Sequence, residues 1–186
     1  MLAHQKEFET LLVKHCACVL QNLKVANMFH IPCFKFSNLK ELVDLYNKKL
    51  HRFHLSIRLF YTGKKRVTIY LYQEDYLSSL LNHTQIHSFL CQYDYPLDHL
   101  DHTLDHLEYR LNQYEEYPHE IGLFLGYPLC DVLGFIHHQK CQYCGYWKVY
   151  KNVQDSYHLF CQFDQCIKQI NDEYSQGKTI EQLIIC

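Results

Sequence analysis

Four residues in the last third of the chain have the types and spacing of a zinc site. The segment "CQYCG" places Cys141 and Cys144 two residues apart, and Gly145 lets backbone amides turn toward their sulfurs, as in a zinc knuckle. His158 and Cys161 in the next segment would complete four ligands. A thioredoxin-like use of the pair is disfavoured, because a strand rather than a helix is expected to follow it. The alternative is that these are partly buried structural thiols.

A second candidate site lies in "YPHEIGLFLGYPLCDVLGFI", residues 117–136, where Tyr-Pro occurs twice, ten residues apart. Because histidine and carboxylate side chains serve as general acids and bases, His119 and Glu120 suit such a pair, with Cys144 as the nucleophile of a small enzyme. The alternative is that both residues only cap a helix opened by Pro118.

The glycines of the same segment point to close packing. A glycine inside a helix costs about 1 kcal/mol relative to alanine, so Gly122 indicates a close approach by another backbone or by a ligand. With Gly126 it forms a Gly-x-x-x-Gly face, and packing alone would account for both. We expect two short helices here, with Pro118 and Pro128 at their first positions and Gly126 ending the first.

A basic segment spans residues 35–66, with nine Lys and Arg against two acids. Because Phe53, Phe60 and Tyr61 are interleaved with the charges, the segment has the composition of a surface for nucleic acid or an anionic ligand. A charged hairpin tip beside a solvated helix face has the same composition. Both interpretations stay open at the level of sequence.

Composition and missing motifs exclude several function classes. The 18 Lys and Arg against 20 Asp and Glu give a net charge of -2, so there is no global attraction to nucleic acid or an anionic membrane. No glycine-rich phosphate loop, dinucleotide fingerprint, nucleophile elbow or His-Glu-x-x-His is present. The first 20 residues lack the apolar core of a secretory signal, and no apolar run approaches the roughly 18 residues of a spanning helix. We therefore expect a cytoplasmic protein without membrane contact, and do not favour a nucleic-acid partner.

What the ten cysteines indicate depends on whether the protein lies in a reducing compartment or is secreted, and we expect a reducing compartment. There, cysteine at this density indicates buried small hydrophobic residues, a metal site or reactive thiols rather than a disulfide framework.

The elements that must position these residues can be read from periodicity. Helical spacing of apolar residues covers 5–20, 74–93, 97–111 and 154–176, and Ser37 resembles the N-cap of a helix that ends at Leu50. Alternating residues predict a hairpin over 53–73 that turns at 62–64, with short strands near 25–31 and 146–150. We expect Pro96 to open the third helix and Gly177 to end the last. The fold class is α+β, a single domain over 1–186 with a small, mainly antiparallel sheet packed by several α-helices.

Three stretches together resemble one bacterial family. They are "HCACVLQNLKVANMF", the segment 117–136 quoted above, and "CGYWKVY" followed by the helix that carries Cys166. The chain is similar, over nearly its whole length, to domain of unknown function 3793, small proteins of anaerobic Gram-positive bacteria. The matching positions are His15, Cys16, Lys24, Asn27, Pro118, His119, Glu120, Gly122, Gly126, Pro128, Asp131, Gly134, Cys144, Gly145, Trp147, Lys148 and Cys166.

The resemblance implies no activity, cofactor or catalytic residue, but it selects residues. Three matching cysteines, Cys16, Cys144 and Cys166, with His15 or His119 as nitrogen ligand, would suit zinc or iron, or redox-active thiols without a metal. The family pattern has proline where this chain has Cys18, and does not require Cys141. We expect any bound cofactor to lie near four other matching positions, Gly122, Gly126, Trp147 and Lys148.

These observations give one leading hypothesis and two alternatives. The leading hypothesis is an accessory protein with a Cys/His site for metal binding or thiol redox chemistry. The alternatives are the small enzyme at the Tyr-Pro-His-Glu turn and a binding module that uses the basic hairpin.

Overall fold

The computed structural model describes residues 2–61, 65–113 and 118–185, which form two compact units. The first contains residues 2–76 and 166–185, and the second contains 77–165. Helices α3 and α8 each contribute residues to both units. Of the helices in the described residues, none combines the length and the apolar character needed to cross a membrane.

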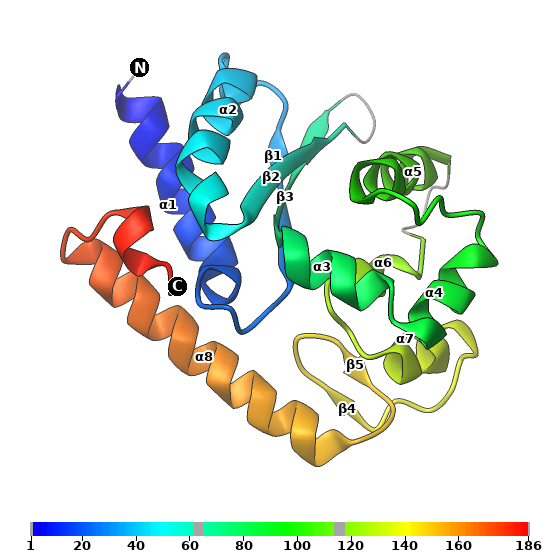
Figure 1. Ribbon diagram of the computed structural model, residues 1–186. Helices are drawn as coiled ribbons and strands as arrows, with labels where there is room; N and C mark the ends of the chain where they lie inside the picture. Colours follow the sequence, from blue (N-terminus) through cyan, green and yellow to red (C-terminus); the bar gives the residue numbers. More distant parts are fainter. Residues whose placement is uncertain (1, 62–64, 114–117, 186) are drawn as a thin grey trace. The chain divides into compact units, whose positions relative to one another are not determined.

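The fold is α+β, as predicted, with a small antiparallel sheet and a majority of helices (Figure 1). In chain order the elements are α1 (Leu2–Leu20), β1 (Ala26–Pro32), α2 (Leu39–Leu50), η1 (His51–Phe53), β2 (Leu55–Phe60), β3 (Arg66–Gln73), α3 (Glu74–Leu81), α4 (Thr84–Cys91), α5 (Leu100–Gln113), α6 (Ile121–Phe124), α7 (Leu129–Ile136), β4 (Tyr143–Cys144), β5 (Lys148–Val149), α8 (Val153–Ser175) and η2 (Ile180–Leu183).

The first unit is built on a three-stranded sheet in the order β1-β3-β2, with both pairs antiparallel. Because β3 is central, six consecutive residues from Val67 to Tyr72 are buried, so its two faces are covered. The predicted hairpin is β2 and β3, paired through Leu59 and Ile69, and the predicted extended piece is β1. The predicted turn at 62–64 lies outside the described residues.

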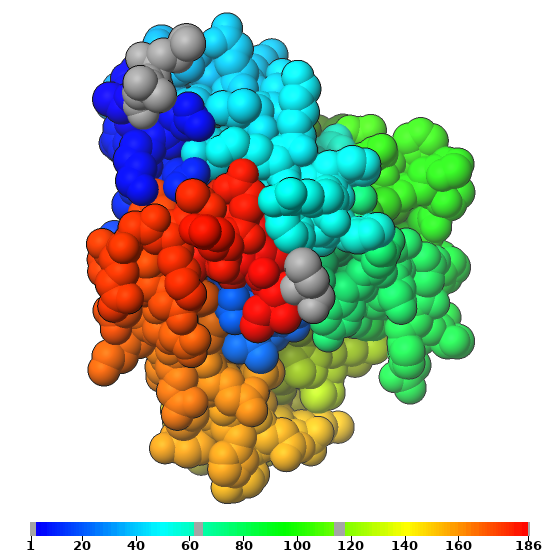
Figure 2. Space-filling view, turned by 60° about the vertical axis from the view of Figure 1, so that its left-hand side comes forward, coloured from blue at the N-terminus to red at the C-terminus, as the bar shows by residue number. Residues whose placement is uncertain are grey.

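Helices α1 and α2 cover the sheet of this unit, α1 against β1 and β3 and α2 against β2. The C-terminal segment closes the unit, lying against α1 and α2 (Figure 2). The Gln21 side chain donates to the Leu183 carbonyl at 2.5 Å, and Lys49 pairs with Glu181 at 3.6 Å. Segments from the two ends of the chain therefore form one core.

The second unit contains α4 to α7 and the two-stranded β4-β5 hairpin. Buried leucines at Leu104, Leu107 and Leu111 make the inner face of α5, as the leucine spacing predicts. Gly126, at φ 79°, ends α6 as predicted, and Gly177, at φ 100°, follows the last turn of α8 in the first unit.

Four predicted helix starts are wrong by one to four residues. The first short helix, α6, begins at Ile121 instead of Pro118. Helix α5, predicted to open at Pro96, begins at Leu100. The Pro96 carbonyl lies outside the helix and accepts a hydrogen bond from the Thr103 hydroxyl at 2.6 Å. Pro128 occupies the N-cap of α7 instead of its first turn, with an extended ψ of 137°. The N-cap of α2 is Asn38 instead of Ser37.

Candidate thiol site

Two cysteines from distant parts of the sequence have hydrogen-bonded side chains in the first unit. Cys18, near the end of α1, lies beside Cys166 of α8, and each is only 7% exposed. Cys16, two residues earlier in α1, is 1% exposed and close enough to Cys18 for their charges to interact. All three are thiols rather than disulfides.

The two paired thiols differ in acidity. The hydrogen bond with Cys166 and then burial raise the pKa of Cys18, whereas the same hydrogen bond lowers the pKa of Cys166 below its ordinary value. Burial raises the pKa of Cys16 to about 12, although the Lys24 charge opposes this shift. Cys166 is therefore the thiol of this group that ionises first, with Cys18 as the hydrogen-bond donor to its sulfur.

Lys24 supplies a positive charge next to this pair. The Cys18 carbonyl accepts the backbone N–H groups of Leu23 (2.9 Å) and Lys24 (3.1 Å), so the turn after α1 folds back onto Cys18. Burial lowers the pKa of Lys24 to about 8. The nearby Cys16 and Cys18 partly oppose this shift, because their charges raise the pKa of the ammonium. Its ammonium donates to the Asn27 side-chain oxygen at 2.7 Å.

The backbone around this group departs from regular helix. Helix α1 is kinked at Cys16, whose φ of -118° and ψ of 16° are not helical. The Asn27 amide donates to the His15 carbonyl at 2.5 Å, and the His15 ring stacks on Phe29 with 4.5 Å between centroids. Four matching positions of the family, His15, Cys16, Lys24 and Asn27, thus meet at the kink.

Sequence reasoning placed Cys16 and Cys166 in one site but missed Cys18, which joins them. Spacing gave no signal for Cys18, because residues two apart in a regular helix point to different faces, and only the kink at Cys16 changes this. A contact between α1 and α8 cannot be read from spacing along the chain.

The expected metal sites are not assembled. Among residues 2–61, 65–113 and 118–185, no three His, Cys, Asp or Glu side chains are grouped to hold a metal ion. This holds for the knuckle set (Cys141, Cys144, His158, Cys161) and for the set of matching cysteines (Cys16, Cys144, Cys166).

The four knuckle residues have other partners or face solvent. The Cys141 thiol donates to the Tyr143 carbonyl at 3.0 Å and to the carbonyl of Val149, on β5, at 3.6 Å. Cys144 is exposed on β4. His158 hydrogen-bonds Gln154 at 3.0 Å, which places it on the exposed side of α8. Cys141 and Cys144 have the spacing of a knuckle, whereas His158 and Cys161 are not its standard second pair, and Cys141 and His158 have other partners.

The expected acid and base pair is divided between interior and surface. Glu120 is 1% exposed, and its carboxylate accepts from the Arg110 guanidinium at 2.7 Å and the Tyr95 hydroxyl at 3.2 Å. His119 is exposed, with its ring edge-on to Phe135. A carboxylate buried in an ion pair does not face the solvent that reaches His119 and Cys144, so this geometry supports a structural role for Glu120.

Asp131 holds the hairpin of the second unit to α7. Its buried carboxylate accepts from the Trp147 indole at 2.9 Å and from the backbone N–H groups of Tyr150 (2.7 Å) and Lys151 (3.3 Å). The indole also stacks on Tyr127 with 4.8 Å between centroids. Asp131 and Trp147 therefore act together as a structural joint.

Two other expected cofactor positions, Gly122 and Lys148, have protein neighbours within the second unit. A Cβ on Gly122 would lie 2.9 Å from Val132 and 3.0 Å from Tyr127, so its close neighbour is a side chain of the same unit. The Lys148 ammonium lies 5.1 Å from the Phe135 ring centroid, in reach of a cation–π contact.

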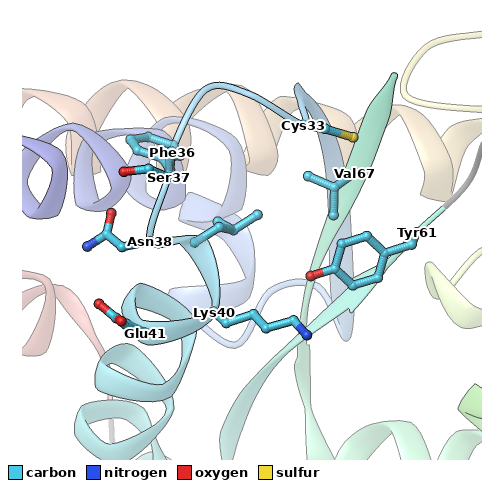
Figure 3. Close-up of a pocket in the computed structure, with 9 residues that line it drawn as sticks. Cys33, Phe36, Ser37, Asn38, Lys40, Glu41, Tyr61 and Val67 are labelled. Carbon is cyan, nitrogen blue, oxygen red and sulfur yellow. The ribbon is translucent and has the colours of Figure 1, made fainter. Parts of the chain in front are cut away.

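A hollow of about 310 Å³ opens at the start of α2 in the first unit (Figure 3). The Lys40 and Tyr61 side chains extend toward the same part of it, and Cys33 lies at another edge. Other basic residues of the segment are paired within the unit, such as Lys35 with Glu7 at 2.5 Å. The basic segment is thus partly neutralised by its own neighbours.

A larger hollow of about 610 Å³ lies between α4 and α7 in the second unit. Its lining is mainly apolar, with Phe89, Leu129 and Leu133 among the contributors. None of the expected catalytic, cofactor or metal residues lines either hollow, but Lys40 and Tyr61 of the basic segment line the smaller one.

Residues 12–184 match the family described as "Protein of unknown function (DUF3793)". No curated protein and no solved structure matches the chain. Because the family match spans nearly all of the sequence, the chain belongs to the DUF3793 family.

Proposed function

We propose that this protein is a thiol-redox accessory protein, in which Cys18 and Cys166 interconvert between a dithiol and a disulfide. The observation that carries the proposal is the hydrogen bond between the two thiols, which come from α1 and α8 and are both buried. Two thiols held in contact need only a small adjustment of their side chains to reach bonding distance. The hydrogen bond with Cys18, which lowers the pKa of Cys166, and the charge of Lys24 favour the thiolate that such chemistry requires.

The pair differs from the other cysteines in a way that favours this role. Cys33, Cys91 and Cys144 are exposed, and Cys141 uses its thiol to bind backbone carbonyls. Cys18 and Cys166 instead have each other as partners. A disulfide between them would join the end of α1 to α8 and so restrain the kinked segment beside Lys24.

The proposal is tested by a redox equilibrium on the full chain. The protein is refolded from urea in glutathione buffers of graded potential, and the bond is quantified by trypsin digestion and mass spectrometry. Cys18 lies in peptide 15–24 and Cys166 in peptide 152–168, so a cross-linked pair of these two peptides reports the disulfide. Starting from urea lets buried thiols equilibrate.

We expect the cross-link to form with a midpoint between about -180 and about -320 mV, the range of cellular thiol pairs. Cys18→Ser and Cys166→Ser should each abolish it. Cys16→Ser and Cys161→Ser, which remove the other thiols from the same two peptides, should leave it intact. If the two peptides stay separate even in the most oxidising buffer, the function is not a dithiol couple.

A further inference from the structure

Burial of the thiol pair restricts which oxidants can reach it. Cys18 and Cys166 are each 7% exposed, whereas Cys33 lies on the surface. Exchange with another disulfide requires a third sulfur, with its substituents, to approach the attacked sulfur and form a mixed disulfide. A buried sulfur leaves no room for that intermediate without local opening of the unit.

We infer that the substrate of this thiol pair is a small, uncharged hydroperoxide, of the size of hydrogen peroxide, rather than a disulfide. This inference rests on the thiol-redox function proposed above and names the oxidant that drives it. A molecule close in size to water reaches a site that glutathione disulfide does not. The absence of charge matters because a charged oxidant would lose its hydration on entering the interior.

The chemistry balances with the two thiols and one hydroperoxide. The Cys166 sulfur attacks the terminal oxygen, the O–O bond breaks, and the leaving oxygen takes the Cys166 proton and departs as an alcohol, or as water from hydrogen peroxide. Cys166 is then a sulfenic acid. The Cys18 sulfur attacks the Cys166 sulfur, the S–O bond breaks, and the hydroxyl leaves as water with the Cys18 proton. The dithiol loses two electrons and the peroxide gains them.

The surroundings of each sulfur suit its step. Cys166 must act first as the nucleophile, and the hydrogen bond with Cys18 lowers the pKa of its thiol. Cys18 must lose its proton in the second step, and the Lys24 ammonium beside it favours the thiolate formed then. Because Cys18 is already in contact with Cys166, the sulfenic acid is resolved before a second peroxide can react.

The experiment compares oxidants at two sites of the same molecule. Reduced, folded protein is treated in turn with hydrogen peroxide, tert-butyl hydroperoxide and glutathione disulfide, and the rate of Cys18–Cys166 cross-linking is measured for each. Cys33, alone in peptide 25–35, gives the rates of an exposed thiol in the same samples. The hydrogen peroxide to glutathione disulfide rate ratio should be at least about tenfold higher at the pair than at Cys33. The bulkier tert-butyl hydroperoxide should be slower than hydrogen peroxide at the pair.

A variant identifies the attacking sulfur. In Cys18→Ser the reaction should stop at the sulfenic acid of Cys166, which dimedone traps on peptide 152–168, and Cys161→Ser in the same background keeps that assignment unique. Equal rate ratios at the pair and at Cys33, or trapping at no position in Cys18→Ser, would overturn the inference. If the refolding equilibrium forms the cross-link while peroxide does not, the inference fails and the dithiol function stands. If the equilibrium forms none, both fail.

Discussion

Glu120 is the residue whose chemistry changes most between sequence and structure. In the sequence it stands beside His119 as half of an acid and base pair. In the structure its buried carboxylate is bound by Arg110 and Tyr95. Burial, and then the Glu120 charge, raise the pKa of Tyr95, so that hydroxyl remains a donor at all ordinary pH values.

The structure therefore predicts that substitutions at these two adjacent residues change the stability of the protein by very different amounts. Glu120→Ala leaves the Arg110 charge, which is 16% exposed, without its carboxylate, and should lower the free energy of unfolding by about 2–4 kcal/mol. His119→Ala removes an exposed side chain and should change it by less than about 0.5 kcal/mol. Urea denaturation followed by circular dichroism measures both. Equal losses in the two variants would contradict the structural role of Glu120.

At the scale of elements, the packing of the β4-β5 hairpin against α7 depends on the absence of a side chain at Gly134. Gly134 is buried in α7, and the ring and Cβ of Tyr150 lie where its side chain would be, with the Tyr150 Cβ at 2.7 Å. Glycine in mid-helix thus allows the hairpin to approach the helix closely, and Asp131 then fixes it there.

Gly134→Ala should therefore destabilise the protein, although alanine favours helix. The added methyl group must displace Tyr150, and overpacking of this kind costs about 1–3 kcal/mol. Ser88→Ala, at an exposed position of α4, is the matched control and should be neutral or slightly stabilising. Thermal unfolding of the two variants gives the comparison, and a Gly134→Ala protein as stable as the parent would show that Tyr150 moves aside at no cost.

How much could be predicted also differs by element. Strands β1 to β3 and helices α1 and α8 were predictable because their apolar periodicity spans many residues. Proline starts were less predictable: Pro128 has the φ of a helix but an extended ψ, because its fixed φ suits both conformations. Tyr157 lies within the apolar spacing of the helix predicted over 154–176, yet its side chain is 48% exposed, because a shift of one residue along a helix turns a side chain by about 100°.

The thiol pair could be predicted only in part for a related reason. Cys16 and Cys166 were selected by resemblance, but Cys18 is the residue that contacts Cys166. The kink at Cys16 changes which α1 side chains face α8, and no regular helical projection contains that change.

At the scale of the whole molecule, Lys24 makes stability depend on pH in a specific window. Its pKa falls from an ordinary 10.5 in the unfolded chain to about 8 in the folded one. Between these values the unfolded chain holds a proton that the folded chain lacks, so raising the pH favours the folded state. The gain approaches about 3 kcal/mol across the window.

The comparison with Lys24→Met isolates this contribution. The stability of the parent protein minus that of Lys24→Met should be constant below about pH 8 and should rise from there to about pH 10.5. Lys14→Met, at an exposed position of α1, serves as the control and should show no such rise. A difference that falls over the window would mean that the site stabilises the charged ammonium.

The chain contains a single tryptophan, and it lies in the Asp131 joint of the second unit. Its indole is stacked on Tyr127 and hydrogen-bonded to a buried carboxylate, so its fluorescence emission is set by that joint. The thiol pair belongs to the first unit, and α8, like α3, contributes residues to both units. The molecule therefore carries its own optical reporter: emission that changes when Cys18 and Cys166 are oxidised would measure how far a bond made in one unit is transmitted to the other.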